Sequence, residues 1–318
     1  MKNFKFIKMQ TFNIKTTHNL FNIKTTHNLF NIKTTHNLLK INGTLNRYYS
    51  SNIILKKKFT DENFNQYLAG IIDGNGLLLL SKKGYGSLEI TMDSRDERCL
   101  AYLKTKLSSG TIKAKAGYKS VRYRIVQQTV MFDLINRING LIRYPQKIKQ
   151  LKILCEHFGI SYIPYSNIDI NSAYFSGLFD VNGTITCFIQ NNKHNSISKP
   201  QLYLSVFSKN KEDLNIWVKL FNGNIYIDHT NKYLSYKWTI KNKQDIIYFL
   251  QYTKNNPLRT LKQSRILLIP QYYRLYELHA FKLGNEVLYK KFKLWFKNFS
   301  SYGYSRDANI KLEASEVK

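Results

Sequence analysis

Two nine-residue segments, LAGIIDGNG at 68–76 and FSGLFDVNG at 175–183, share one pattern of small, apolar and acidic residues. In each segment a glycine stands about one helical turn before an aspartate, and the two glycines are 107 residues apart. Small residues at helical spacing let two helix backbones approach closely, because no side chain holds them apart. The pattern therefore predicts two helices packed against each other. The residues assigned to this packing are Ala69, Gly70, Asp73, Gly76, Ser176, Gly177, Asp180 and Gly183.

Each segment opens the same succession of elements, α-β-β-α-β-β-α. Strands are predicted where apolar and polar residues alternate, and helices where apolar residues recur every three or four positions. In the first copy the predicted helices are 65–73, 96–107, 130–138 and 147–158, and the strands are 77–82, 88–92, 111–116 and 121–127. In the second copy the helices are 173–180, 211–221 and a closing set from 244–252 onward, and the strands are 184–190, 201–208, 224–228 and 234–240.

This succession predicts an α+β fold, with antiparallel hairpins on one side and helices on the other. We divide the chain into a first repeat (61–163), a polar linker (164–172), a second repeat (173–300) and a tail (301–318). The second repeat closes with a predicted amphipathic helix at 288–299, whose apolar stripe packs on the domain and whose other face carries lysines.

The composition points to a folded protein with an anionic partner. Lys and Arg number 49 against 20 Asp and Glu, for a net charge of +29, and 43% of the residues are hydrophobic. No apolar run approaches the roughly 18 residues of a membrane span, so we expect no membrane partner. Three widely separated cysteines predict neither a disulfide framework nor a zinc site. A basic excess of this size favours nucleic acid as the partner.

The N-terminal 60 residues contain ten lysines and Arg47 but no acid, and the nine-residue unit FNIKTTHNL occurs there three times. A basic, acid-free, hydroxyl-containing segment is typical of mitochondrial targeting. We therefore expect residues 1–50 to be a leader to the mitochondrial matrix. The alternative is a basic tail that contacts nucleic acid directly.

The twin segments, each followed by two hairpins, resemble the signature motifs of the LAGLIDADG homing endonucleases and intron maturases. Further similarity lies in Ile138–Arg143, Asn256–Thr260 and Arg265–Tyr273. The resemblance covers roughly residues 64 to 298. It implies a monomer with an internal pseudo-two-fold axis, in which the motif helices lie at the centre and two antiparallel sheets form a saddle over the nucleic acid.

In that family the penultimate motif residue is an acid, and the two acids together hold the divalent metals between the strands being cut. Here these positions are Asn75 and Asn182. Mg²⁺ prefers carboxylate oxygens, so the resemblance implies degenerate catalytic positions, no intact metal site and no cofactor. Mg²⁺ would be required only if the protein were an active endonuclease.

The resemblance also indicates which side chains face the nucleic acid. We expect polar, basic and aromatic residues on the open face of each sheet, among them Tyr236, although any antiparallel sheet shows a polar face to water. Arg143, Lys147, Arg259 and Lys262 are the nearest matches to basic residues near the active centre of family members, and they are further candidates for backbone contacts. The nucleic-acid-binding candidates are Lys82, Lys113, Lys115, Arg122, Arg124, Arg143, Lys147, Tyr226, Lys232, Lys237, Arg259 and Lys262.

Three functions are compatible with these features. The first is a mitochondrial RNA-binding, maturase-like factor that assists splicing of a group I intron or folding of an organellar RNA, with DNA cleavage lost. The second is an active Mg²⁺-dependent homing endonuclease that makes double-strand cuts in duplex DNA. The third is a structural component of a mitochondrial ribonucleoprotein such as the ribosome, with rRNA in place of intron RNA as the structured partner.

Overall fold

The computed structural model describes residues 61–189, 199–228 and 234–303. The predicted leader (1–50), the binding candidate Lys232 and all but the first three residues of the tail lie outside the described residues. Residues on both sides of the linker belong to one compact unit.

The first repeat begins with a helix over residues 61–75, which we call the first motif helix. The elements that follow are β1 (Gly76–Leu80), β2 (Gly86–Asp93), the 3₁₀ turn η2 (Ser94–Asp96), α2 (Glu97–Leu107), β3 (Thr111–Ala114), β4 (Ser120–Ile125), α3 (Gln128–Ile138) and α4 (Pro145–His157). Pro145 at the start of α4 suits a first helical position, because its missing N–H would have no partner there.

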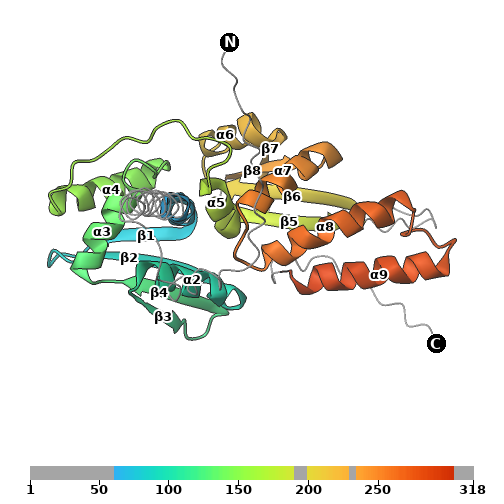
Figure 1. Cartoon of the computed structure of the whole chain (residues 1–318), viewed down its shortest axis with the longest axis horizontal. Helices are drawn as coiled ribbons and strands as arrows, with labels where there is room; N and C mark the ends of the chain where they lie inside the picture. Colours follow the sequence, from blue (N-terminus) through green and yellow to red (C-terminus); the bar gives the residue numbers. More distant parts are fainter. Residues whose placement is uncertain (1–60, 190–198, 229–233, 304–318) are drawn as a thin grey trace, which may run out of the picture. The chain divides into compact units, whose positions relative to one another are not determined.

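The second repeat begins with α5 (Tyr174–Asn182), the second motif helix. It continues with β5 (Gly183–Phe188), β6 (Gln201–Ser208), α6 (Glu212–Phe221), β7 (Asn224–Asp228), β8 (Ser235–Ile240), α7 (Lys243–Asn255), α8 (Lys262–Glu277) and α9 (Glu286–Ser301). Figure 1 shows these elements along the chain.

The two sheets have the same topology. Sheet A has the strand order β1-β2-β4-β3 and sheet B the order β5-β6-β8-β7, and every pairing is antiparallel. Each motif helix leads directly into the first strand of its sheet, so that Gly76 pairs with Ile90 and Gly183 with Val206. The predicted α+β fold of two pseudo-symmetric repeats is confirmed.

Helices cover one face of each sheet (Figure 1), and alternate strand residues on that face are buried. The core of the first repeat is mainly aliphatic, whereas that of the second combines aliphatic residues with many more aromatic rings. Around Trp217, the ring centroids of Phe175, Trp238 and Phe221 lie 5.0 to 5.5 Å away. The two repeats therefore share one topology but differ in the residues that pack their cores.

The first motif helix departs from the sequence prediction at its end. The predicted helix ends at residue 73, but the observed helix continues through Asn75. A Cβ added to Gly76 would lie 2.6 Å from Cα of Ile72, and one added to Gly183 would lie 2.5 Å from the carbonyl oxygen of Phe179. Glycine is needed at both positions because the first strand residue lies against the last turn of the preceding helix, where a side chain would clash with it.

The closing helix α9 packs on α8 through the predicted aromatic stripe. Phe292, Trp295, Phe296 and Phe299 are buried, and the indole N–H of Trp295 donates to the carbonyl of Leu268 at 3.0 Å. Of the helices in the described parts of the chain, none combines the length and the apolar character that a bilayer crossing requires.

Candidate nucleic-acid interface

The two motif helices cross at their glycines. A Cβ on Gly70 would lie 2.1 Å from the carbonyl oxygen of Tyr174, and a Cβ on Gly177 would lie 2.1 Å from that of Tyr67. Neither position can take a larger side chain while the backbones stay in contact. Ala69 and Ser176 beside them are also buried. The helix pair is therefore held at a distance set by main-chain atoms.

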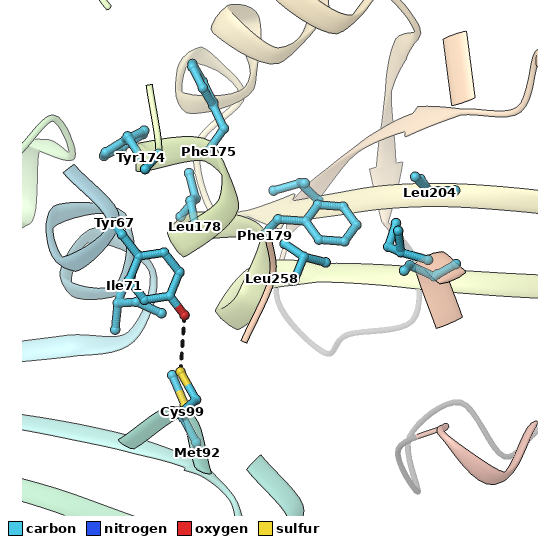
Figure 2. Packing of buried hydrophobic residues seen from close by; sticks show 14 of the residues in the cluster. Tyr67, Ile71, Met92, Cys99, Tyr174, Phe175, Leu178, Phe179, Leu204 and Leu258 are labelled. Carbon is cyan, nitrogen blue, oxygen red and sulfur yellow. Dashed lines mark hydrogen bonds between the residues drawn. The ribbon is translucent and has the colours of Figure 1, made fainter. Parts of the chain in front are cut away.

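A crossed pair of hydrogen bonds links the same two helices. The hydroxyl of Tyr67 donates to Asp180 at 2.7 Å, and the hydroxyl of Tyr174 donates to Asp73 at 2.7 Å. Tyr67 also lies 3.2 Å from the sulfur of Cys99, the contact drawn in Figure 2. Each tyrosine thus reaches across the pseudo-two-fold axis to the aspartate of the other motif.

The aspartates also connect each motif helix to the segment behind its own sheet. Asp73 accepts the backbone N–H of Arg143 at 2.8 Å and that of Tyr144 at 3.2 Å. Asp180 accepts the backbone N–H of Arg259 at 2.8 Å and both the N–H and the hydroxyl of Thr260. The acids satisfy buried donors and do not point into an open site.

Burial dominates the electrostatics of both aspartates. It raises the pKa of Asp73 to about 7, against the opposing hydrogen bonds from Tyr174 and from the backbone of Arg143 and Tyr144. Burial likewise raises the pKa of Asp180, with the charge of Lys262 acting in the opposite direction. A carboxyl group removed from water favours its neutral form. These are structural acids in a dry helix interface.

The two degenerate positions lie at the ends of the motif helices. The side-chain amide of Asn75 donates to the carbonyl oxygen of Thr91 in β2. The side-chain oxygen of Asn182 lies close to Gly74, where an added Cβ would be 3.2 Å from it. Within the described ranges, no three His, Cys, Asp or Glu side chains gather as a metal site would require. Two neutral amides do not fit a Mg²⁺ site, which is built from carboxylates.

The two lysine candidates behind the motif helices contact the protein itself. The amine of Lys147 donates to the carbonyl oxygen of Gly76, and that of Lys262 donates to the carbonyl oxygen of Asp180. Burial lowers the pKa of Lys147, and Lys262 is buried. In this conformation both amines stabilise the ends of the motif helices.

The two arginine candidates stack on tyrosine rings. The guanidinium of Arg259 lies 3.6 Å from the ring centroid of Tyr102, and that of Arg143 lies 4.9 Å from the ring centroid of Tyr165. Arg143 is half-buried and Arg259 is exposed. Arg259 is therefore the more accessible of the two.

The open face of sheet A brings together the basic candidates of its strands. Arg122 pairs with Lys113 across β3 and β4, and Arg124 extends from the same face of β4. Glu89 of β2 lies between the arginines, 2.9 Å from Arg124 and 3.4 Å from Arg122. Glu89 is absent from the residues predicted from the sequence, since its pairing with both arginines depends on the strand register.

The remaining sheet A candidates flank this face. Lys82 is exposed in the turn between β1 and β2, and Lys115 is exposed just after β3, with its amine 4.6 Å from the ring centroid of Tyr118.

On sheet B, Tyr226 of β7 and Lys237 of β8 are register partners on the open face. Tyr236 was expected there too, but this prediction is wrong. Its neighbour Trp238, two residues along, is buried among the helices, and alternate residues of a strand share a face. Tyr236 therefore points to the helix side.

Tyr67 and Tyr174 are likewise absent from the residues predicted from the sequence. A signal was present, because they are 107 residues apart, the same separation as the two motif glycines.

Comparison with known proteins agrees with this architecture. Residues 175–273 match the family model described as LAGLIDADG endonuclease. The intron-encoded DNA endonuclease ai2b of Dictyostelium discoideum is 32% identical over 235 residues, which cover 72% of this chain and 87% of that protein. The intron-encoded RNA maturase bI4 of Saccharomyces cerevisiae is 36% identical over 254 residues. The probable intron-encoded endonuclease aI2 of Debaryomyces hansenii is 32% identical over 259 residues.

The last two alignments each cover 78% of this chain, but only 38% and 39% of the relatives, so the chain spans well under half of their length. Among solved structures, the meganuclease I-SmaMI bound to an uncleaveable DNA has a TM-score of 0.58 at 14% identity, covering 74% of this chain and 98% of that one. I-AabMI bound to uncleaved DNA has a TM-score of 0.55 at 18% identity, covering 73% and 98%. The paired motif helices, the two equivalent sheets and the identity to ai2b place this chain in the LAGLIDADG endonuclease family.

Proposed function

We propose that this protein binds nucleic acid and assists the splicing or folding of an intron RNA in mitochondria, without cutting DNA. The observation that carries the proposal is the pair of amides, Asn75 and Asn182, at the motif positions where the family resemblance implies metal-binding acids. The mitochondrial part of the proposal rests on the basic, acid-free N-terminal segment.

The chemistry of the amide explains why cleavage would be lost. In two-metal cleavage the ions stabilise both the attacking and the leaving oxygen. An asparagine keeps one side-chain oxygen but removes a negative charge, and here the charge is missing from both halves of the site. The Asn75 amide, moreover, is already hydrogen-bonded to Thr91 of sheet A.

Binding to an RNA needs no metal site. Residues 61–318 carry a net charge of +18, and the basic residues of sheet A lie partly exposed on its open face, where phosphates compete with Glu89 for the two arginines. A protein that binds a folded RNA more tightly than the unfolded chain shifts the folding equilibrium of that RNA by its differential affinity. The relative bI4 is named an intron-encoded RNA maturase, which supports an RNA as the partner.

The proposal is tested by identifying the bound RNA and then assaying it. RNA crosslinked to the full chain in the organelle should yield intron sequences, and the purified chain should accelerate splicing of that intron in vitro. Reads confined to ribosomal RNA would favour the ribonucleoprotein component instead. An intron that splices at the same rate with and without the protein would contradict the proposed function.

An active endonuclease is the second candidate, because ai2b is named a DNA endonuclease. Its test is incubation of the full chain with duplex DNA carrying the matching intron-insertion sequence, in Mg²⁺ or Mn²⁺. We expect no double-strand product from the natural protein, and such a product would contradict the proposed loss of cleavage.

Restoring both acids tests the degenerate site directly. We expect the double variant Asn75→Asp, Asn182→Asp to gain Mn²⁺ binding in calorimetry. A matched control, Asn224→Asp with Asn285→Asp, adds the same charge at an exposed position of β7 and at the N-cap of α9. If both double variants bind the ion equally, the gain reflects net charge and not the motif positions.

A further inference from the structure

The open faces of the two sheets have diverged in chemistry, although their topology is the same. All eight strands are described. The open face of sheet A carries three basic residues, two acids and no aromatic ring: Lys113, Arg122, Arg124, Glu89 and Asp93. That of sheet B carries four aromatic residues with one lysine and one buried aspartate: Phe188, Tyr203, Phe207, Tyr226, Lys237 and Asp228.

Three of the sheet B residues form a row across neighbouring strands. Lys237 of β8 is the register partner of Phe207 in β6 on one side and of Tyr226 in β7 on the other. The amine of Lys237 lies 5.7 Å from the ring centroid of Phe207. Adjacent strands are about 4.8 Å apart, so one cation stands between two rings roughly 10 Å apart.

Solvent reaches the row, in which Phe207 and Lys237 are half-buried and Tyr226 is more exposed. Tyr226 is 43% exposed and, nearer the other end of the face, Phe188 is 44% exposed. Tyr203 of β6 lies between Tyr226 and Phe188 on this face and is the register partner of Thr186 in β5. The hydroxyl groups of Ser205 and Thr239 are hydrogen-bonded to each other at 2.9 Å. The open face of sheet A has the same topology without an aromatic ring, although it carries the exposed Leu77 and Leu79, so the four rings of sheet B are not required by the fold.

Aromatic rings recognise the flat faces of nucleic-acid bases, and those faces are accessible only where the bases are unpaired. In a duplex they are stacked within the helix, and the backbone phosphates are what a basic surface meets. We propose that the open face of sheet B is a stacking site for unpaired nucleotides, with bases on Phe207 and Tyr226 and a phosphate near Lys237. Sheet A, by contrast, contacts the phosphates of paired segments. This assignment rests on the proposed nucleic-acid-binding function. It adds that sheet B binds the unpaired nucleotides of the ligand and sheet A its paired segments.

The test compares three probes on the full chain at fixed salt: a short oligoadenylate RNA of about ten nucleotides, the same sequence as DNA, and an RNA duplex of equal length. Tyr226→Leu and Phe207→Leu should each weaken oligoadenylate binding about tenfold and leave duplex binding within about twofold. Tyr226→Phe keeps the ring and should bind oligoadenylate like the natural protein.

Two controls separate stacking from charge and from loss of fold. Tyr118→Leu removes a tyrosine that is 68% exposed in the β3–β4 turn of sheet A and should leave oligoadenylate binding unchanged. The double variant Arg122→Gln, Arg124→Gln should weaken duplex binding more than oligoadenylate binding. Thermal unfolding of every variant checks the fold, and Tyr226 lies on an edge strand, where little packing is lost.

If the sheet B variants lose affinity for the single-stranded RNA and DNA, or for the RNA alone, the stacking site is supported. The comparison of the RNA with the DNA then shows whether the sugar contributes to binding. If the sheet B variants bind oligoadenylate unchanged, or lose oligoadenylate and duplex equally, the assignment is wrong. Because the readout is binding and not splicing, either result leaves the splicing test of the proposed function independent.

Discussion

The hydroxyl of Tyr67 donates a 2.7 Å hydrogen bond to Asp180, a residue 113 positions away that belongs to the other motif helix. The equivalent bond from Tyr174 to Asp73 runs in the opposite direction across the same helix pair. Together with the glycine contacts, these two bonds fix both the distance and the register of the helices. They also place the helix ends, with Asn75 and Asn182, at a defined position between the two sheets.

Removing one hydroxyl should weaken the helix pair measurably. Tyr67→Phe leaves the buried Asp180 with one donor fewer, so we expect the unfolding free energy to fall by about 1 to 2 kcal/mol. Urea denaturation measures this change. Tyr85→Phe removes a hydroxyl from an exposed tyrosine in a turn and should leave the midpoint unchanged. Equal midpoints for the two variants would show that the crossed bond contributes nothing to stability.

The glycine crossing should not tolerate one added methyl group. In Gly70→Ala the new Cβ would lie 2.1 Å from a backbone oxygen, so the helices must separate and the buried contacts on both sides loosen. We expect a loss of roughly 3 kcal/mol in unfolding free energy. Gly284→Ala, where the space around the residue is open, is the control and should be close to neutral. Similar stability of the two variants would contradict the close helix crossing.

The raised pKa of Asp73, about 7 against an ordinary value of 3.8, predicts a specific pH dependence. Between these values the folded protein binds more protons than the unfolded chain, so stability decreases as the pH rises through this range. Asp73→Asn should remove this contribution, and the difference in unfolding free energy between natural protein and variant should change with pH only in that window.

The same residue offers an internal check. The hydroxyl of Tyr174 lowers the pKa of Asp73 in the folded protein, so Tyr174→Phe should extend the upper end of the window to higher pH. Parallel stability curves for the natural protein and Asp73→Asn, measured in urea from about pH 4 to 8, would contradict the raised pKa.

Glu89 should reduce the affinity of the basic residues of sheet A for phosphates. Its carboxylate lies 2.9 Å from Arg124 and 3.4 Å from Arg122, and Glu89→Gln would free both guanidinium groups for phosphates. We expect tighter binding to duplex RNA and a steeper loss of affinity with salt. Asp93→Asn makes the same charge change on the same strand, next to Arg95 instead. If both variants gain affinity equally, net charge accounts for the effect and Glu89 has no special role.

Several features followed from the sequence because they depend on local patterns. Alternating apolar residues located β6 and β7 with the bounds that the structure has, and the apolar stripe of α9 located its buried aromatic face. The repeated motif identified two equivalent units, since its glycines recur at one separation. Local periodicity reflects which face of an element is buried, and this is enough to deduce the α+β class.

The roles of individual charged and polar side chains were decided by tertiary structure. A sequence pattern marks Lys147 and Lys262 as cations, but only the fold brings their amines against the carbonyl oxygens of Gly76 and Asp180. The partnership of Glu89 with two arginines depends on the strand register. The side to which Tyr236 points follows from alternation with Trp238 within β8, and this could have been deduced from the sequence once the burial of Trp238 was recognised. Hydrogen bonds and ion pairs join residues far apart in the chain, so their partners follow from how the elements pack. The substitution of both motif acids by asparagine was read from the sequence alone; the helix crossing that brings these two amides to the same end of the paired helices was decided by the fold.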